Sequence, residues 1–110
     1  MKPENHRLRA EALETQIPLL TDPSAIIEIC WGAAYQWICW GCDRKYGKHP
    51  QKHTGVVKYL KDIGELERSA RWAAMEGVRI GGFYGTKAQD VEVALARQLL
   101  QEFRTWALSS

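Results

Sequence analysis

The sequence predicts an all-α, up-and-down bundle of four to five helices. Two observations carry this prediction: helix start and stop signals recur along the chain, and no alternating run of β-branched residues is flanked by turn pairs. The 110 residues suit one compact domain with its own core. An apolar content of 45% and a charged content of 25% are ordinary values for a globular protein.

The N-terminal part of the chain predicts one amphipathic helix. It spans about 3–17 and stops at Pro18, because proline removes a backbone donor and clashes with the preceding turn. We therefore divide the chain into an N-terminal helix and linker, 1–21, and a helical bundle, 22–110.

A second helix is predicted over 23–44. Thr21 or Asp22 serves as its N-cap, and Pro23 occupies the first turn. The helix is apolar nearly all round, which is typical of a central helix or one shared with a partner chain. Because its tryptophans point in different directions, we expect it to expose more apolar surface than one bundle covers, and hence a homodimer. These are Trp31, Trp37 and Trp40.

Two further helices follow a loop that begins near Gly47, a candidate C′ residue. A short helix is predicted over 54–61, and Gly64 separates it from a longer helix over 65–80. The longer helix carries a seam of small and apolar residues that permits close helix packing, namely Leu66, Ala70, Ala73, Gly77 and Ile80. We expect Gly81-Gly82 to unwind its end.

The last helix is predicted to begin at Thr86, with Gln89 completing a capping box. Its buried stripe is expected at Val91, Leu95, Leu99, Phe103 and Trp106.

Charge and cysteine content indicate a cytoplasmic protein without a membrane span. Three cysteines, an odd number, argue against a disulfide framework, and no apolar run approaches the length of a membrane span.

The net charge is only +2, yet the basic segment, 44–61, holds six cations and no acid. That segment either meets phosphates or forms a solvated loop and helix face.

Cys39-Trp-Gly-Cys42 allows three interpretations. A redox centre is disfavoured, because such pairs usually open a helix after a strand. A zinc site with His49 and His53 is disfavoured, because only six residues separate the two pairs, where zinc fingers need a dozen or more. We favour core packing by two small side chains, and we expect no metal site.

Arg79 and Tyr84 form the candidate ligand site. An arginine at a helix end beside Gly81-Gly82 suits a phosphate or carboxylate, and the glycines would bring the phenol to the same side. The alternative is an ion pair of Arg79 with Glu76, one turn earlier, and Tyr84 as packing.

Four segments in order resemble the HEPN (higher eukaryotes and prokaryotes nucleotide-binding) family. They are AIIEICWGAAYQWICWGC, KHTGVVKYL, ARWAAMEGVRIGGFYG and DVEVALARQLLQEF. The resemblance implies a dimeric helical bundle that works beside a nucleotidyltransferase in toxin–antitoxin-like pairs. Active members are metal-independent ribonucleases that use an arginine and a histidine four to six residues later. Arg79 matches that arginine.

The motif histidine is replaced by Phe83, Tyr84 or Gly85, and Gln36 stands where a helix-borne histidine is usual. Tyrosine, with an ordinary pKa near 10, is a poor base at neutral pH. In the family, the arginine and the histidine lie at a cleft of the dimer. His49 and His53 are the histidines of this chain that can reach such a cleft from elsewhere. The candidate ligand-binding residues are Arg79, Tyr84, Gln36 and Tyr35.

Three hypotheses follow from these observations. The leading one is a cofactor-free binding and regulatory module that recognises a nucleotidyltransferase-like partner, a nucleotide or RNA without cleaving it. The second is a ribonuclease that uses Arg79. The third is a structural bundle in which Arg79 forms only an ion pair.

Overall fold

The predicted all-α fold is confirmed. The computed structural model describes residues 2–84 and 90–109, and this part of the chain contains helices and no strand. The elements are α1 (Pro3–Gln16), the 3₁₀ turn η1 (Ile17–Leu19), α2 (Pro23–Tyr46), α3 (Val56–Asp62), α4 (Leu66–Tyr84) and α5 (Asp90–Leu108).

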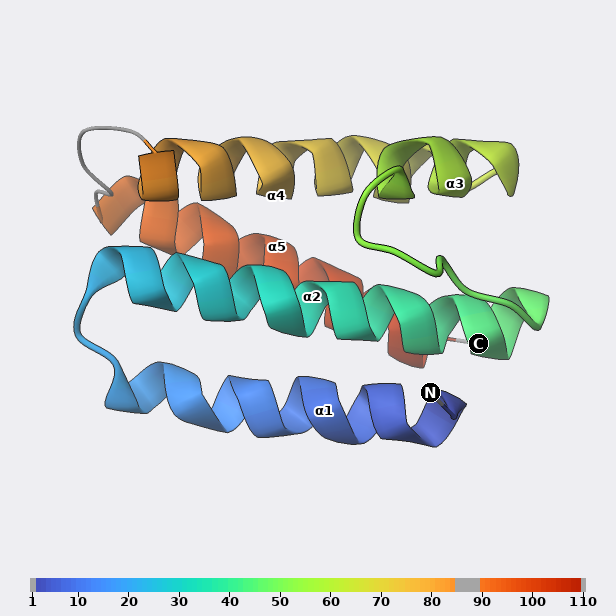
Figure 1. The fold of residues 1–110 in the computed structure, drawn as a ribbon, viewed down its shortest axis with the longest axis horizontal. Helices are drawn as coiled ribbons and strands as arrows, with labels where there is room; N and C mark the ends of the chain where they lie inside the picture. Colours follow the sequence, from blue (N-terminus) through green and yellow to red (C-terminus); the bar gives the residue numbers. More distant parts are fainter. Residues whose placement is uncertain (1, 85–89, 110) are drawn as a thin grey trace.

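Helix α2 lies at the centre of the bundle and packs against α1, α4 and α5 (Figure 1). The short α3 packs against α4. Both chain ends lie at the same end of the bundle, on the right of Figure 1. The core is one continuous cluster to which α1 contributes Ala10 and η1 contributes Ile17.

The predicted signals around α2 are confirmed. The Asp22 carboxylate accepts a hydrogen bond of 2.9 Å from the Ala25 backbone amide, so Asp22 is the N-cap. Gly47 follows the last helical residue with φ of 76°, a left-handed conformation that glycine adopts without a Cβ penalty. Gly64, which separates α3 from α4, has φ of 86°.

The predicted unwinding at Gly81-Gly82 is wrong, because α4 continues through both glycines to Tyr84. Glycine lowers helix stability by only about 1 kcal/mol relative to alanine and keeps its backbone N–H, so the pair does not oblige a helix to stop. The proposed capping box of Thr86 and Gln89 lies outside the described residues.

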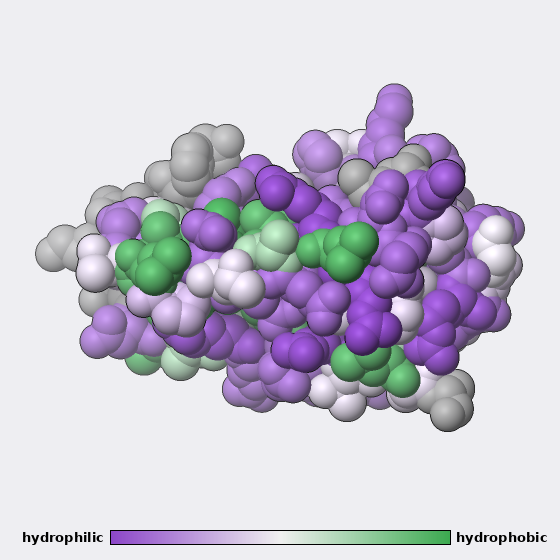
Figure 2. All heavy atoms as spheres, turned by 90° about the horizontal axis from the view of Figure 1, so that it is seen from below, coloured by the Kyte–Doolittle hydropathy of each residue, from purple (hydrophilic) through white to green (hydrophobic). Residues whose placement is uncertain are grey.

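The expectation that α2 leaves broad apolar surface exposed is also wrong. Trp37 is fully buried, Trp40 is 7% exposed, and Trp31 is partly buried within a single chain. Helix α1 closes one side of α2, and the surface seen from that side is mostly hydrophilic, with separate apolar patches (Figure 2). The burial of α2 therefore gives no argument for a dimer.

The seam of small and apolar residues on α4 faces outward. Leu66 is 66% exposed, Ile80 is 56% exposed, and the three small residues between them are also exposed. The core takes the opposite face of the helix, where Trp72, Met75 and Val78 bury more apolar area than alanines can.

The buried stripe predicted on α5 is correct in its second half only. Leu99 and Phe103 are buried and Trp106 is partly buried, whereas Val91 is 76% exposed and Leu95 is 38% exposed. Three residues outside the predicted stripe complete the buried face, namely Ala96, Leu100 and Ala107. Across the described residues, no helix combines the length and the apolar character needed to cross a bilayer.

Candidate functional site

A cavity of about 430 Å³ lies between α4 and the segment that leads into α3. Its polar side chains come from both elements, and its apolar wall includes Val56, Val57 and Trp72. The polar residues that line it are His53, Thr54, Glu76 and Arg79. Of the candidate ligand-binding residues whose side chains the structure describes, Arg79 lines this cavity.

Arg79 is held by a carboxylate from the central helix. Its Nε lies 3.1 Å from both carboxylate oxygens of Glu28, and its Nη2 lies 2.8 Å from Oε1. The guanidinium also stacks over the Trp31 ring, with Cζ 3.9 Å from the ring centroid. The forked, charge-assisted pair and the stacking together fix the orientation of the guanidinium. A lysine does not reproduce this arrangement, because its ammonium group is neither planar nor forked.

The ion-pair partner is therefore Glu28 rather than Glu76. Side-by-side packing of α2 and α4 places Glu28 opposite Arg79. Glu76, one turn before Arg79 on the same helix, contributes to the cavity lining. Sequence spacing within one helix finds only local partners, so it missed this contact between helices.

His53 shares the Trp31 ring with Arg79. The imidazole meets the indole edge to face, with ring centroids 5.4 Å apart, and it lines the same cavity as the guanidinium. Of the two histidines left open by the sequence, His53 therefore lies at Arg79. His49 instead pairs with Asp43, at 2.8 Å.

Two other candidate residues, Tyr35 and Gln36, do not line this cavity. Tyr35 stacks on Trp31 at a centroid distance of 6.2 Å, and its hydroxyl donates to the Pro50 carbonyl at 3.4 Å. Burial is the main cause that raises the pKa of Tyr35 well above its usual range. The Tyr35 phenol therefore packs against Trp31 and remains protonated at neutral pH.

Gln36 faces α1, where its Oε1 lies 2.6 Å from Nδ1 of His6. Tyr84 lies five residues, or about 140° of helix rotation, beyond Arg79. The Tyr84 side chain lies outside the described residues.

The CxxC thiols lie in the core of α2. Both cysteines are fully buried and free of disulfides. Burial raises the pKa of Cys39 to about 12 and the pKa of Cys42 to about 12. Because the thiolate is the nucleophile and the metal ligand, these environments oppose both redox and zinc chemistry and favour core packing.

The basic segment is partly engaged within the chain. Arg44 and Lys45 donate to backbone carbonyls at the C-terminal end of α5, and both reach the Ser109 carbonyl. Lys58 pairs with Asp62 at 2.6 Å on an exposed face. These contacts agree with a segment that ties the end of α5 to α2, and they leave phosphate binding there a prediction.

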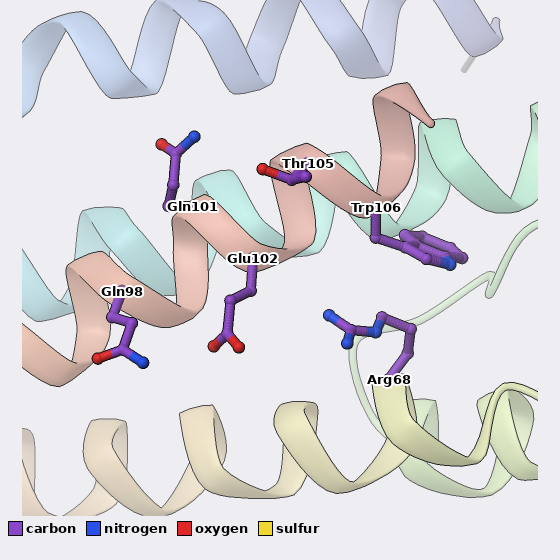
Figure 3. A pocket seen from close by; sticks show the side chains of 6 residues that line it. All are labelled: Arg68, Gln98, Gln101, Glu102, Thr105 and Trp106. Carbon is purple, nitrogen blue, oxygen red and sulfur yellow. The ribbon is translucent and has the colours of Figure 1, made fainter. Parts of the chain in front are cut away.

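A larger cavity, of about 490 Å³, lies between α4 and α5. In Figure 3, Arg68 extends from α4 towards α5 and Glu102 extends from α5 towards α4. Two glutamines, Thr105 and Trp106 complete the lining. Among the residues whose side chains the structure describes, none that the sequence singled out for chemistry lines this cavity.

Comparison with models of known protein families, with curated proteins and with solved structures finds no match. The resemblance to the HEPN family therefore stays a prediction. The cluster of Arg79, Glu28, Trp31 and His53 is the geometric basis on which function is proposed.

Proposed function

We propose that the protein is a binding module that takes a nucleotide, or one nucleotide of an RNA, in the cavity between α4 and the segment leading into α3. The observation that carries this proposal is the placement of His53 and Arg79 on one Trp31 ring at the cavity. The volume of about 430 Å³ lies in the range of small-molecule sites.

Each wall of the cavity suits one part of a nucleotide. Arginine and histidine donate hydrogen bonds to phosphate oxygens, and Val56 and Val57 offer apolar contact for a base. A phosphate must share the guanidinium with Glu28, which already accepts from Nε and Nη2. We therefore expect modest affinity, with a Kd of roughly 10 µM to 1 mM.

The second candidate function is metal-independent ribonuclease activity, which the position of His53 favours. An imidazole titrates near neutral pH and moves protons there, and an arginine beside it stabilises charge on a scissile phosphate. This arrangement differs from the motif of the family that the chain resembles, since the histidine precedes the arginine in the sequence.

The test titrates nucleoside monophosphates and short RNAs against the wild type, Arg79→Ala and His53→Ala. Arg104→Ala is the matched control, because Arg104 also pairs with a glutamate, Glu14, and lies over a tryptophan, Trp37. We expect at least tenfold weaker binding for the first two variants and no change for the control. Equal affinity for folded Arg79→Ala would leave the ion pair as a structural feature.

The same proteins incubated with RNA in EDTA separate the two functions. Cleavage by the wild type that both Arg79→Ala and His53→Ala abolish would establish the ribonuclease. Binding without cleavage would establish the binding module.

We also propose that two copies associate through the outward seam of α4, and that a nucleotidyltransferase-like protein is the partner. The exposed side chains of Leu66 and Ile80, with small residues between them, support close contact between two such helices. Sedimentation at tens of micromolar tests the dimer, and co-purification with a co-expressed nucleotidyltransferase tests the partner.

A further inference from the structure

A second polar cluster lies at the other end of α2, away from Arg79. It joins three segments: His6 from α1, Asp43 from the last turns of α2, and His49 from the loop after it. Each side chain offers one potential ligand atom, and the three atoms lie within 4.8 Å of one another. The cluster is largely covered, since His6 is 6% exposed and the side chains of Asp43 and His49 are 9% and 19% exposed.

Two atoms of this cluster are buried without a hydrogen-bond partner. They are Nε2 of His6 and Oδ2 of Asp43. A buried polar atom without a partner lowers stability, so native proteins keep few of them. The described residues keep five such atoms, and two of the five belong to this cluster. Two such atoms from different helices in one cluster indicate that something binds between them.

The hydrogen bond to Gln36 sets the protonation of His6. Nδ1 of His6 lies 2.6 Å from Gln36 Oε1, and an amide oxygen only accepts, so Nδ1 carries the proton. In the neutral ring, Nε2 then presents a bare lone pair. Histidines that ligate metals are oriented in this way, by donating the other ring N–H to an oxygen.

We propose that His6, Asp43 and His49 form a binding site for one divalent zinc ion. Two imidazoles and one carboxylate are a ligand set that Zn²⁺ accepts, with bonds of about 2.0–2.2 Å. Such bonds place neighbouring ligand atoms about 3.4 Å apart in a tetrahedron, so the cluster closes by about 1 Å around the ion. Water completes the fourth position.

The ion would bind side chains from three segments of the chain at once. The N-terminal part of α1 becomes tied to the end of α2 and to the loop that carries His49. Zinc therefore stabilises the folded chain, because it binds the native arrangement of ligands and not the unfolded one. Sequence patterns missed the site, since His6 lies 37 residues from Asp43 and the cysteine pair drew attention away from it.

The test is calorimetric titration of the EDTA-stripped, dialysed 110-residue chain with zinc chloride. We expect one ion per chain, a higher melting temperature with zinc, and at least tenfold weaker binding for His6→Ala, Asp43→Asn and His49→Ala. Gln36→Leu tests the positioning residue and is expected to weaken binding about 10–100-fold. His53→Ala, which removes the third histidine, is the matched control and is expected to bind normally.

Cobalt substitution distinguishes sulfur ligands from nitrogen and oxygen ligands without any variant. Co²⁺ bound to nitrogen and oxygen gives visible ligand-field bands and lacks the near-ultraviolet sulfur-to-cobalt band that a Cys39 or Cys42 ligand produces. The absence of stoichiometric binding to the folded wild type would overturn the proposal. So would a sulfur band, or loss of binding in His53→Ala or in the Cys39→Ala/Cys42→Ala double variant.

Discussion

Two polar clusters along α2 differ in how completely their groups are paired. In the first, the guanidinium of Arg79 meets the Glu28 carboxylate and the Trp31 ring. In the second, two ionisable side chains, His6 and Asp43, each keep one buried atom without a partner, whereas in the first the buried atom without a partner is the neutral Nε1 of Trp31. Both clusters bridge α2 to a neighbouring element, so helix packing alone does not explain the difference.

We interpret the first cluster as one that stabilises the fold and the second as the proposed zinc site. A charged pair with its hydrogen bonds made offsets the free energy of its own desolvation. Unpaired buried atoms carry that unfavourable free energy until a ligand arrives. We therefore expect substitutions in the first cluster to destabilise the protein without metal, and substitutions in the second to act mainly on metal binding.

The stretch of α2 between the clusters is expected to give the largest effect, through pH. Burial raises the pKa of Cys39 and Cys42 to about 12 each and that of Cys30 to about 11. Above pH 9 the unfolded chain loses thiol protons that the folded chain keeps, so the free energy of unfolding falls as pH rises. Below pH 8 these thiols contribute no slope. Each thiol contributes about 1.4 kcal/mol per pH unit between its two pKa values.

Urea unfolding at pH 7, 9 and 10.5 measures this slope. The Cys39→Ala/Cys42→Ala double variant is expected to fold and to show a shallower decline between pH 9 and 10.5. An identical decline in the variant would contradict the assignment to these thiols. Tyr46 adds to the remaining slope, because its hydrogen bond to Glu65 raises its pKa to about 12.

Arg79→Ala is expected to lower the free energy of unfolding by about 1–2 kcal/mol. The loss combines a forked ion pair with stacking on Trp31, and it stays moderate because the Arg79 side chain is 30% exposed. A double-mutant cycle with Glu28→Ala, measured by urea unfolding, isolates the pair. A coupling energy near zero would show that Arg79 and Glu28 are in contact but that their ion pair does not stabilise the fold.

Much of the fold followed from local signals in the sequence. Asp22 as N-cap and Gly47 and Gly64 as helix ends are fixed by capping and by positive φ, which depend on neighbouring residues only. Which face of α4 is buried depends instead on the neighbouring helices. The sequence favoured small residues for close packing, whereas the bundle buries the large Trp72 and Met75.

The candidate site was predicted only in part for the same reason. Arg79 was found because it stands just before Gly81-Gly82, yet its partner Glu28 lies 51 residues away. His53 was left open because nothing in its local pattern points to α4. Contacts between segments far apart in the sequence determine the surroundings of Arg79 and His53. A single sequence does not show such contacts.

Gly77→Ala is expected to stabilise the monomer by about 0.5–1 kcal/mol. Helical glycine is less favourable than alanine, and an added Cβ at Gly77 meets no atom within 4 Å. Gly41→Ala is the contrasting control at the crossing of α2 and α5, where a Cβ would lie 2.5 Å from Trp106. We expect that variant to lose about 1–3 kcal/mol.

Gly77→Ala also tests whether the outward seam of α4 is a dimer interface. If two copies meet along the seam, the methyl group at position 77 weakens the dimer while it stabilises the monomer. Sedimentation at several concentrations, beside urea unfolding, measures both effects. A dimer unchanged by Gly77→Ala would place the interface elsewhere.

His6→Gln in zinc-free protein is expected to give the smallest effect, a change within about 0.5 kcal/mol in the free energy of unfolding. The substitution removes a buried ring nitrogen that has no partner, and the new amide brings an N–H donor for the Gln36 oxygen that Nδ1 now contacts. It also removes the edge contact of His6 with the His49 ring, at 4.7 Å between centroids, so gain and loss nearly cancel. Urea unfolding in EDTA, with Arg79→Ala measured beside it, gives the comparison directly. A loss as large as that of Arg79→Ala would mean that the His6 cluster already stabilises the metal-free fold, and the contrast between the two ends of α2 would disappear.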